Sequence, residues 1–160
     1  MKIRLNLLTL SIITFVFLFS SAAQAQESDA LLQFQLSNQL KKSAAQWNRG
    51  DLDGFLNDYL QSGDMTFTSG GQILKGFEAL SQRYRRNYGD SPQTMGRLSF
   101  SDLEVWSLGR DKAQALVVGR WRLVRDSAGQ DQVDEGVFTL VMVQLGQEWK
   151  ILHDHTSSSR

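Results

Sequence analysis

The stretch Trp149-Lys150-Ile151-Leu152-His153-Asp154-His155-Thr156-Ser157 decides the fold that we predict, because it has the pattern of a β-strand and holds both histidines of the chain. Side chains on successive strand residues point to opposite faces, so a regular strand places His153 and His155 on one face together with Ile151. Asp154 is then expected on the opposite face. This strand therefore presents its two histidines to one environment and its aspartate to another.

Three helices are expected before most of the strands. Apolar residues recur at spacings of three and four over residues 28–47, 52–60 and 77–88. Gly70-Gly71 predicts a hairpin between two short strands. Longer strands are expected at 97–106, 113–124, 136–144 and 149–157, and the first of these changes phase at a bulge near Ser101-Asp102. The order predicts an α+β domain with three N-terminal helices packed on a strongly bent, mainly antiparallel sheet.

The N-terminal segment has the features of a secretory signal peptide. Lys2 and Arg4 precede an apolar run over residues 5–19, and Ala23-Gln24-Ala25 supplies a small-residue cleavage motif. An uncleaved anchor is the alternative, but the run is short for a bilayer span of ~20 residues. We expect residues 1–25 to be a Sec-type signal peptide cleaved after Ala25. The protein is then periplasmic or secreted, with no membrane association after cleavage.

The composition excludes several classes of protein. The chain has 17 basic and 17 acidic side chains, so removal of Lys2 and Arg4 leaves 15 against 17, a formal charge of −2. This balance lacks the basic excess of a nucleic-acid-binding domain, and no nucleic-acid partner is expected. The chain has no cysteine, so its stability depends on a hydrophobic core. We expect one domain over residues 26–156 and a disordered tail over residues 157–160.

The strand at 136–144 is apolar on both faces. Its valines point one way, while Phe138, Leu140 and Met142 point the other way. A strand of this kind is normally covered on both faces, whereas three helices cover only one face of the sheet. A second copy of the chain is the simplest cover for the other face, and we predict a homodimer.

Four segments together carry a resemblance to a known family. They are 47–59 (Trp47-Asn48-Arg49-Gly50-Asp51-Leu52-Asp53-Gly54-Phe55-Leu56-Asn57-Asp58-Tyr59), Asp64-Met65-Thr66-Phe67, Gly76-Phe77-Glu78-Ala79-Leu80 and the final strand. In this order they resemble the nuclear transport factor 2-like superfamily, in the branch near SnoaL-like proteins and the calcium/calmodulin-dependent kinase II association domain. The resemblance implies a cone-shaped α+β fold, whose curved sheet wraps the helices and leaves a deep pocket.

The same resemblance allows steroid isomerase chemistry to be checked by position. The carboxylate base of those enzymes would fall on Thr68 or Ser69, and their oxyanion-stabilising tyrosine would fall near Ser43. Neither the base nor the electrophile that proton abstraction beside a carbonyl requires is present at these positions. We therefore do not expect steroid isomerase activity.

The two histidines allow three interpretations. Residues i and i+2 of a strand can converge on a metal ion, but a zinc-type site needs a third protein ligand, and no nearby motif supplies one. His155 is alternatively a general acid or base beside a carboxylate such as Asp64 or Glu135. In the third interpretation, His155 is a polar residue of the pocket and His153 lies at an interface. We expect no metal and no cofactor.

Several other residues are candidates for contacts with a ligand. Aromatic side chains expected inside the cone or at its rim are Tyr59, Phe67, Tyr84, Trp106 and Trp121, together with the imidazole of His153. Each of these aromatic residues is alternatively an ordinary core residue. Arg120 shares a face with Arg122 and is a candidate to hold a carboxylate, although arginines on a sheet face also pair with acids across a subunit contact. The arginines at 83, 85 and 86 are expected on the solvated side of their helix.

Two hypotheses of different classes follow. In the first, the protein is a secreted, dimeric module that binds a small apolar or carboxylate-bearing molecule in an aromatic pocket. In the second, it is a cofactor-free enzyme of the lyase or isomerase type that uses His155 as general acid or base. An assembly or immunity partner of another secreted protein is a third interpretation. A pocket carboxylate within hydrogen-bond reach of His155 favours the enzyme, and we favour the binding module.

Overall fold

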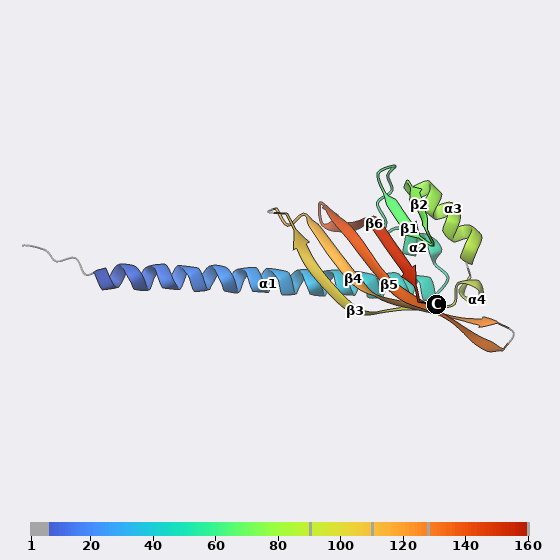
Figure 1. Ribbon diagram of the computed structural model, residues 1–160, viewed down its shortest axis with the longest axis horizontal. Helices are drawn as coiled ribbons and strands as arrows, with labels where there is room; N and C mark the ends of the chain where they lie inside the picture. Colours follow the sequence, from blue (N-terminus) through green and yellow to red (C-terminus); the bar gives the residue numbers. More distant parts are fainter. Residues whose placement is uncertain (1–6, 90, 110, 128, 160) are drawn as a thin grey trace, which may run out of the picture.

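The computed structural model describes the backbone of residues 7–89, 91–109, 111–127 and 129–159, and the side chains at 24, 26–89, 91–109, 111–126 and 129–159. Helices and strands are arranged as one long N-terminal helix, two shorter helices around a small hairpin, and four long strands (Figure 1). Their bounds are α1 (Leu7–Asn48), α2 (Leu52–Leu56), β1 (Thr66–Ser69), β2 (Gln72–Lys75), α3 (Phe77–Tyr88), α4 (Pro92–Met95), β3 (Arg97–Leu108), β4 (Gln114–Ser127), β5 (Gln130–Leu145) and β6 (Glu148–Ser158).

The strands form one six-stranded mixed sheet in the order β2-β1-β6-β5-β4-β3. β1 and β6 are parallel, and the other neighbouring pairs are antiparallel. The predicted α+β class and the mainly antiparallel sheet are therefore confirmed. The short helix α4 was not predicted; the Ser91 side chain caps its start and Pro92 occupies its first turn, a combination that favours helix initiation.

Helix α1 is longer than the predicted helix over residues 28–47. No glycine or proline occurs between Leu5 and Asn48, so nothing in the sequence interrupts the helix before Gly50, which has a φ of 81°. The N-terminal part of α1 projects away from the domain, and the C-terminal part packs against the sheet (Figure 1). In the part of the chain whose side chains are described, no helix is long and apolar enough to cross a membrane.

Glutamines of α1 fix the helix against the sheet. The Gln33 side chain donates to the Leu103 carbonyl at 2.9 Å. Gln39 donates to the Asp58 carboxylate at 3.0 Å and to the Trp149 carbonyl at 2.9 Å. The apolar face of α1 packs into the core, together with α2, α3 and the inner face of the sheet. The largest side chains that are fully buried there are Leu36, Leu52, Leu56, Met65, Leu80, Met95, Val117 and Met142.

Two predicted changes of chain direction are confirmed. Gly70 and Gly71 both have positive φ angles, 57° and 74°, and connect β1 to β2. The pairing of β3 with β4 shifts register between Ser101 and Glu104, where Asp102 adopts a φ of 51°. A residue with positive φ inside a strand marks a bulge, and this one bends β3.

A second bulge, in β6, was not predicted and reverses the expected faces of the strand. His153 pairs with Val141, but Ile151 pairs with the next residue, Met142, so Leu152 is an extra residue on β6. One extra residue moves every following side chain to the other face. Asp154 is consequently buried on the same face as Ile151, and the expectation that the histidines share this face is wrong.

The end of β6 also differs from the expected tail. The predicted strand covered residues 149–157 and a disordered tail was expected over residues 157–160, whereas β6 continues to Ser158 and Ser157 pairs with Val137 of β5. The amide of Ser159 then donates to the Glu135 carbonyl at 2.8 Å. Residues 157–159 therefore extend the sheet beside β5.

Candidate functional site

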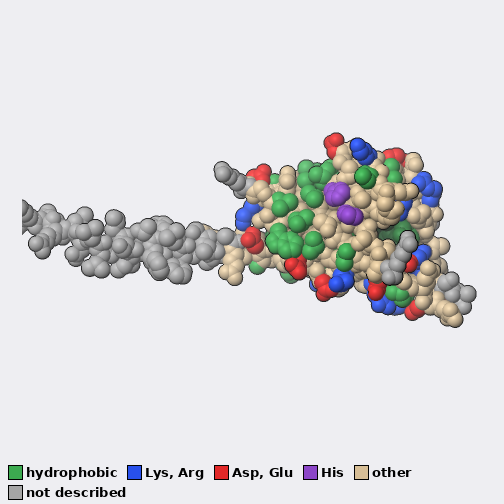
Figure 2. Space-filling view, in the orientation of Figure 1, with side chains coloured by type: hydrophobic (Ala, Val, Ile, Leu, Met, Phe, Trp, Pro, Cys, Tyr) green, Lys and Arg blue, Asp and Glu red, His purple; other side chains and the backbone are tan. Residues whose placement is uncertain are grey.

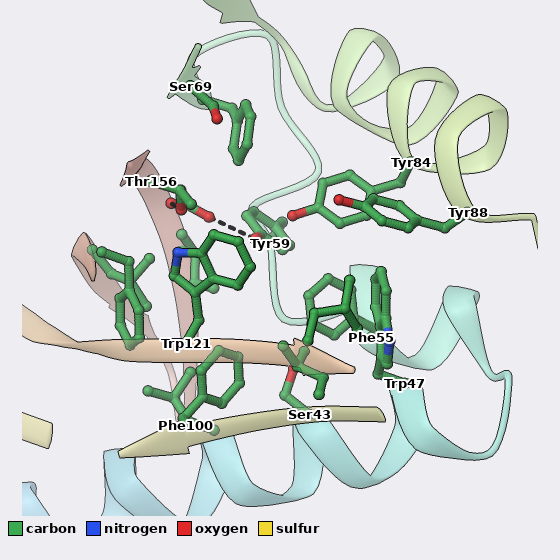
Figure 3. Close-up of a pocket in the computed structure, with 18 of the residues that line it drawn as sticks. Ser43, Trp47, Phe55, Tyr59, Ser69, Tyr84, Tyr88, Phe100, Trp121 and Thr156 are labelled. Atoms are coloured by element: carbon green, nitrogen blue, oxygen red, sulfur yellow. Dashed lines mark hydrogen bonds between the residues drawn. The ribbon is translucent and has the colours of Figure 1, made fainter. Parts of the chain in front are cut away.

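A cavity of about 250 Å³ lies between the inner face of the sheet and helices α1, α2 and α3 (Figure 3). This volume is slightly below the usual range of small-molecule pockets, roughly 300–1,000 Å³. Nine aromatic side chains line it, namely Trp47, Phe55, Tyr59, Phe67, Tyr84, Tyr88, Phe100, Trp121 and Phe138. Its polar lining comprises Ser43, Ser69, Arg83, Asp134, Asp154, Thr156 and Ser158.

A chain of hydrogen bonds holds a carboxyl group at the cavity wall. Tyr59 donates its hydroxyl proton to Asp154 Oδ2 at 2.7 Å, and Thr156 donates to Asp154 Oδ1 at 2.7 Å. The Tyr84 ring lies next to this group, with its centroid 6.4 Å from that of Tyr59. The arrangement brings together residues from α3, the segment after α2, and β6.

Burial sets the protonation of these groups. Asp154 is only 4% exposed, and its loss of hydration raises the pKa of the carboxyl group, although the hydrogen bonds from Tyr59 and Thr156 oppose this effect. Burial also raises the pKa of Tyr59 and of Tyr84, and the charge of Asp154 adds to both shifts. Both hydroxyls therefore stay protonated and act as donors, so this part of the wall offers a directed hydrogen-bonding surface.

Tyr84 of α3 is the centre of an aromatic cluster on one side of the cavity. Its ring centroid lies 5.6 Å from those of Phe55 and Tyr88 and 6.0 Å from that of Trp47. Tilted and edge-to-face contacts at these distances are favourable arrangements for aromatic rings. The ring of Tyr84 is therefore held in place by aromatic packing.

Phe138 of β5 forms the opposite wall. Its ring lies 5.4 Å from that of Phe100, in an edge-to-face contact. A Cβ atom at Gly119 would come within 2.8 Å of Phe138 Cζ and 2.6 Å of Leu103 Cδ2. The missing side chain at Gly119 thus makes room for the Phe138 ring, which shapes this wall of the cavity.

Four of the residues predicted to contact a ligand line the cavity. They are Tyr59, Phe67, Tyr84 and Trp121. Trp121 is also anchored, because its indole nitrogen donates to the Ser157 carbonyl at 3.1 Å. Trp121 faces inward, as the alternation of side chains along β4 predicts. A role of these four residues in ligand binding stays a prediction.

The other predicted site residues lie on the outer face of the sheet, away from the cavity. Trp106 is 45% exposed, and Arg120 forms an ion pair with Asp102 at 3.1 Å. His153 Nδ1 lies 2.7 Å from Thr66 Oγ1, and His155 is exposed. None of these four residues lines the cavity. For both histidines the reason is the bulge at Leu152, and Arg120 and Trp106 follow the outward phase of their strands.

Sequence reasoning missed three charged groups of the cavity, Arg83, Asp134 and Asp154. It did identify Ser43 and Ser69, at the positions where the resemblance would place isomerase residues, and both line the cavity. Carboxyl groups therefore do occur in this cavity, but on β5 and β6 instead of β1. In the described side chains, no group of three or more His, Asp or Glu residues is arranged to hold a metal ion.

No protein-family model and no curated protein matches the chain. Among solved structures, it is similar to a nuclear transport factor 2-like protein of unknown function from Shewanella oneidensis MR-1, with 32% identity and a TM-score of 0.66, over 82% of this chain and 98% of that one.

Two more distant solved structures share the fold alone. The association domain of C. elegans CaMKII is 15% identical, with a TM-score of 0.66, over 83% of this chain and 99% of that one. A putative scytalone dehydratase from Novosphingobium aromaticivorans DSM 12444 is 8% identical, with a TM-score of 0.68, over 84% of this chain and 89% of that one.

Proposed function

This chain belongs to the nuclear transport factor 2-like superfamily, and we propose that it is a member whose cavity binds a small, mainly apolar molecule of roughly a dozen non-hydrogen atoms. Membership alone does not select this function, because one fold hosts many unrelated activities. The proposal rests on the cavity of this chain. The observation that carries it is an aromatic enclosure around one buried carboxyl group, Asp154, whose two oxygens accept hydrogen bonds from Tyr59 and Thr156.

Aromatic walls and a few oriented polar groups are the two requirements of a small-molecule site. The rings offer apolar contact area, and burial of apolar ligand surface contributes about 25 cal/mol per Å². Asp154 and Tyr59 supply orientation, since a carboxyl group that already accepts two hydrogen bonds retains lone pairs for a ligand donor. A ligand with a hydroxyl or amine group in its apolar body fits this arrangement.

A substitution that fills the cavity with a larger side chain tests this function. Ser69 lies at the cavity wall, so Ser69→Phe is expected to abolish binding of a neutral apolar probe, 4-phenylbutanamide, measured by isothermal titration calorimetry. Ser99→Phe is the matched control, because Ser99 is exposed on β3 and is not part of the lining. Equal binding by wild type and by Ser69→Phe would contradict the proposal. Native mass spectrometry of protein purified from its source gives the mass of any retained ligand.

Cofactor-free acid–base catalysis of the lyase or isomerase type is a second candidate, favoured by one observation. Asp154 is a cavity carboxyl group whose pKa is raised by burial, as required for a general acid or base near neutral pH. The residue suggested for this role is thus Asp154 instead of His155. Turnover of a bound molecule that disappears in Asp154→Asn, with binding retained, would select the enzyme.

We also propose that the protein is a homodimer that associates through the outer face of the sheet. Trp106, Leu116, Val141 and His153 lie side by side across β3, β4, β5 and β6. Figure 2 shows hydrophobic side chains and both histidines together at the surface of the molecule. Exposed apolar patches of this kind mark interaction sites. The likeness to the CaMKII association domain supports an oligomer.

Export through an N-terminal signal peptide remains part of the proposal. Among the described side chains of α1, the first buried residue of the core is Leu32, so cleavage after Ala25 would leave every core residue of this described part in the mature protein. The expected mature N-terminus is Gln26. Intact-mass measurement of the protein recovered from the periplasm or the medium tests this position. Protein found only in the cytoplasm with residues 1–25 intact would contradict export.

A further inference from the structure

Arg83 is a charged group of the cavity that the proposed function leaves unexplained. It lies on α3, is half-buried, and lines the cavity. Its guanidinium carbon stands 5.6 Å from the centroid of the Phe67 ring, in a cation–π contact. No carboxylate among the described side chains forms an ion pair with it. A partly desolvated cation without a counter-ion is costly, and an anion at this position would offset that cost.

The other arginines of α3 show that this placement is specific. Arg85 forms an ion pair with Asp53, and Arg86 is exposed outside the cavity. Arg83 differs because it lies three residues after Leu80, which is fully buried, and directly before Tyr84. Residues three and four apart share a helix face, so Arg83 lies near the buried face of α3. Arg85 and Arg86 are exposed instead.

We propose that the ligand of this cavity is an amphipathic carboxylate, with its anionic group bound by Arg83 and its apolar body held among the aromatic rings. This inference rests on the proposed binding function and specifies its ligand class. The planar guanidinium group binds a carboxylate through two parallel hydrogen bonds, which gives direction as well as affinity. The contact with the Phe67 ring restricts the position of the guanidinium group at the cavity wall.

The charge distribution of the cavity sets the orientation of such a ligand. Arg83 directly precedes Tyr84 on α3, and the Tyr84 ring lies 6.4 Å from that of Tyr59, which donates to Asp154. The remaining carboxyl group of the lining, Asp134, is paired with Arg125. A carboxylate placed at Asp154 would meet a like charge, whereas at Arg83 it meets an opposite one. The ligand therefore enters with its carboxylate at Arg83 and its uncharged end toward Tyr59 and Asp154.

The test compares two probes of the same shape, 4-phenylbutanoate and 4-phenylbutanamide, by isothermal titration calorimetry on the mature protein at pH 7. A charge-assisted, two-point contact predicts that the carboxylate binds wild type at least ~10-fold more tightly than the amide. Arg83→Gln is expected to remove this preference, so that the two probes bind this variant with similar affinity. Arg86→Gln removes an exposed charge from the same helix and is expected to keep the preference. Arg83→Lys keeps the positive charge but lacks the planar guanidinium group that makes two parallel hydrogen bonds. This variant is expected to retain part of the preference for the carboxylate.

The outcomes separate this inference from the function on which it rests. If wild type binds both probes equally, or if Arg83→Gln keeps the preference, the carboxylate inference is wrong and the binding function stands. If wild type binds neither probe at millimolar concentration, the binding function fails and the inference fails with it. Raising the salt concentration provides a further readout, since it should weaken binding of the carboxylate and leave the amide unaffected.

Discussion

Asp154 and His155 are adjacent ionisable residues of β6, but they lie on opposite faces of the strand and in opposite environments. Asp154 points inward, is buried, and has its carboxyl oxygens occupied by the hydroxyls of Tyr59 and Thr156. His155, one residue later, points outward and is exposed. In sequence, the histidine is the more obvious candidate for chemistry at neutral pH. The comparison teaches that location determines function here, because a buried carboxyl group meets a cavity ligand and an exposed imidazole meets solvent or a partner.

The same contrast extends to β5, where adjacent residues differ most in their expected effect on stability. Phe138→Ala removes a buried ring of the cavity wall and is expected to lower the free energy of unfolding by about 3–5 kcal/mol. Val137→Ala is the matched control: Val137 is 46% exposed, and the expected cost is below about 1 kcal/mol. Urea unfolding measures both. Equal costs for the two variants would contradict the assignment of inner and outer faces.

The outer face can be tested by introducing charge into its apolar patch. Trp106→Asp would bury a carboxylate in the proposed dimer interface, and we expect the dimer dissociation constant to rise at least ~100-fold. Sedimentation velocity at micromolar concentration measures the change. Ser99→Asp, near the charged rim formed by Arg122 and Glu135, is the control and should leave the dimer intact. A wild-type protein that sediments as a monomer would rule out the homodimer.

Asp154 is expected to make the free energy of unfolding depend on pH. Burial raises the pKa of Asp154 in the folded state, so the folded protein binds a proton more tightly than the unfolded chain does. The stabilisation is complete below the unfolded pKa and is lost as the pH rises through the folded pKa. Relative to Asp154→Asn, wild type should therefore lose stability from pH 4 upward, by about 1.4 kcal/mol for each unit of pKa difference.

Urea unfolding of both proteins at several pH values measures this difference. Asp58, whose pKa is also raised by burial, is present in both proteins and cancels in the comparison. A constant difference between wild type and Asp154→Asn from pH 4 to pH 8 would show that Asp154 does not titrate differently on folding.

The smallest effect is expected at His155. Because this side chain is exposed and lies outside the cavity lining, His155→Asn should change the free energy of unfolding by less than about 0.5 kcal/mol. Affinity for 4-phenylbutanoate should be unchanged in calorimetry. A loss of cavity binding in this variant would mean that the outer face is coupled to the cavity.

Much of the fold was predictable because its elements follow regular periods. Alternation along β4 correctly placed Ala115, Val117 and Leu123 inward, and all three are buried. The bulge in β3 was also predictable, because apolar residues on either side of Ser101-Asp102 alternate out of phase. Regular alternation and an abrupt change of phase are both visible in a sequence.

The bulge in β6 could not be predicted for a physical reason. Ile151 and Leu152 are both apolar, so the pattern is the same whether the strand is regular or carries an extra residue at Leu152. The position of Asp154 depends entirely on this choice. For Arg83 a signal did exist, because its spacing from Leu80 places it on the inner side of the helix, but the neighbouring arginines favoured a solvated interpretation.

The parallel pairing of β1 with β6 has a consequence for how the protein folds. β6 lies between β1 and β5 in the sheet. It follows β5 directly after a short turn, whereas β1 ends at Ser69, far earlier in the chain than the start of β6 at Glu148. Until residues 148–158 pair as β6, no strand pairing joins the β1–β2 hairpin to β3, β4 and β5. The part of the cavity wall that carries Asp154 is also missing until then. Such distant pairings slow folding, because a long loop must close before its contacts stabilise it. We therefore expect the cavity to form late and all at once, after β6 joins the two parts of the sheet.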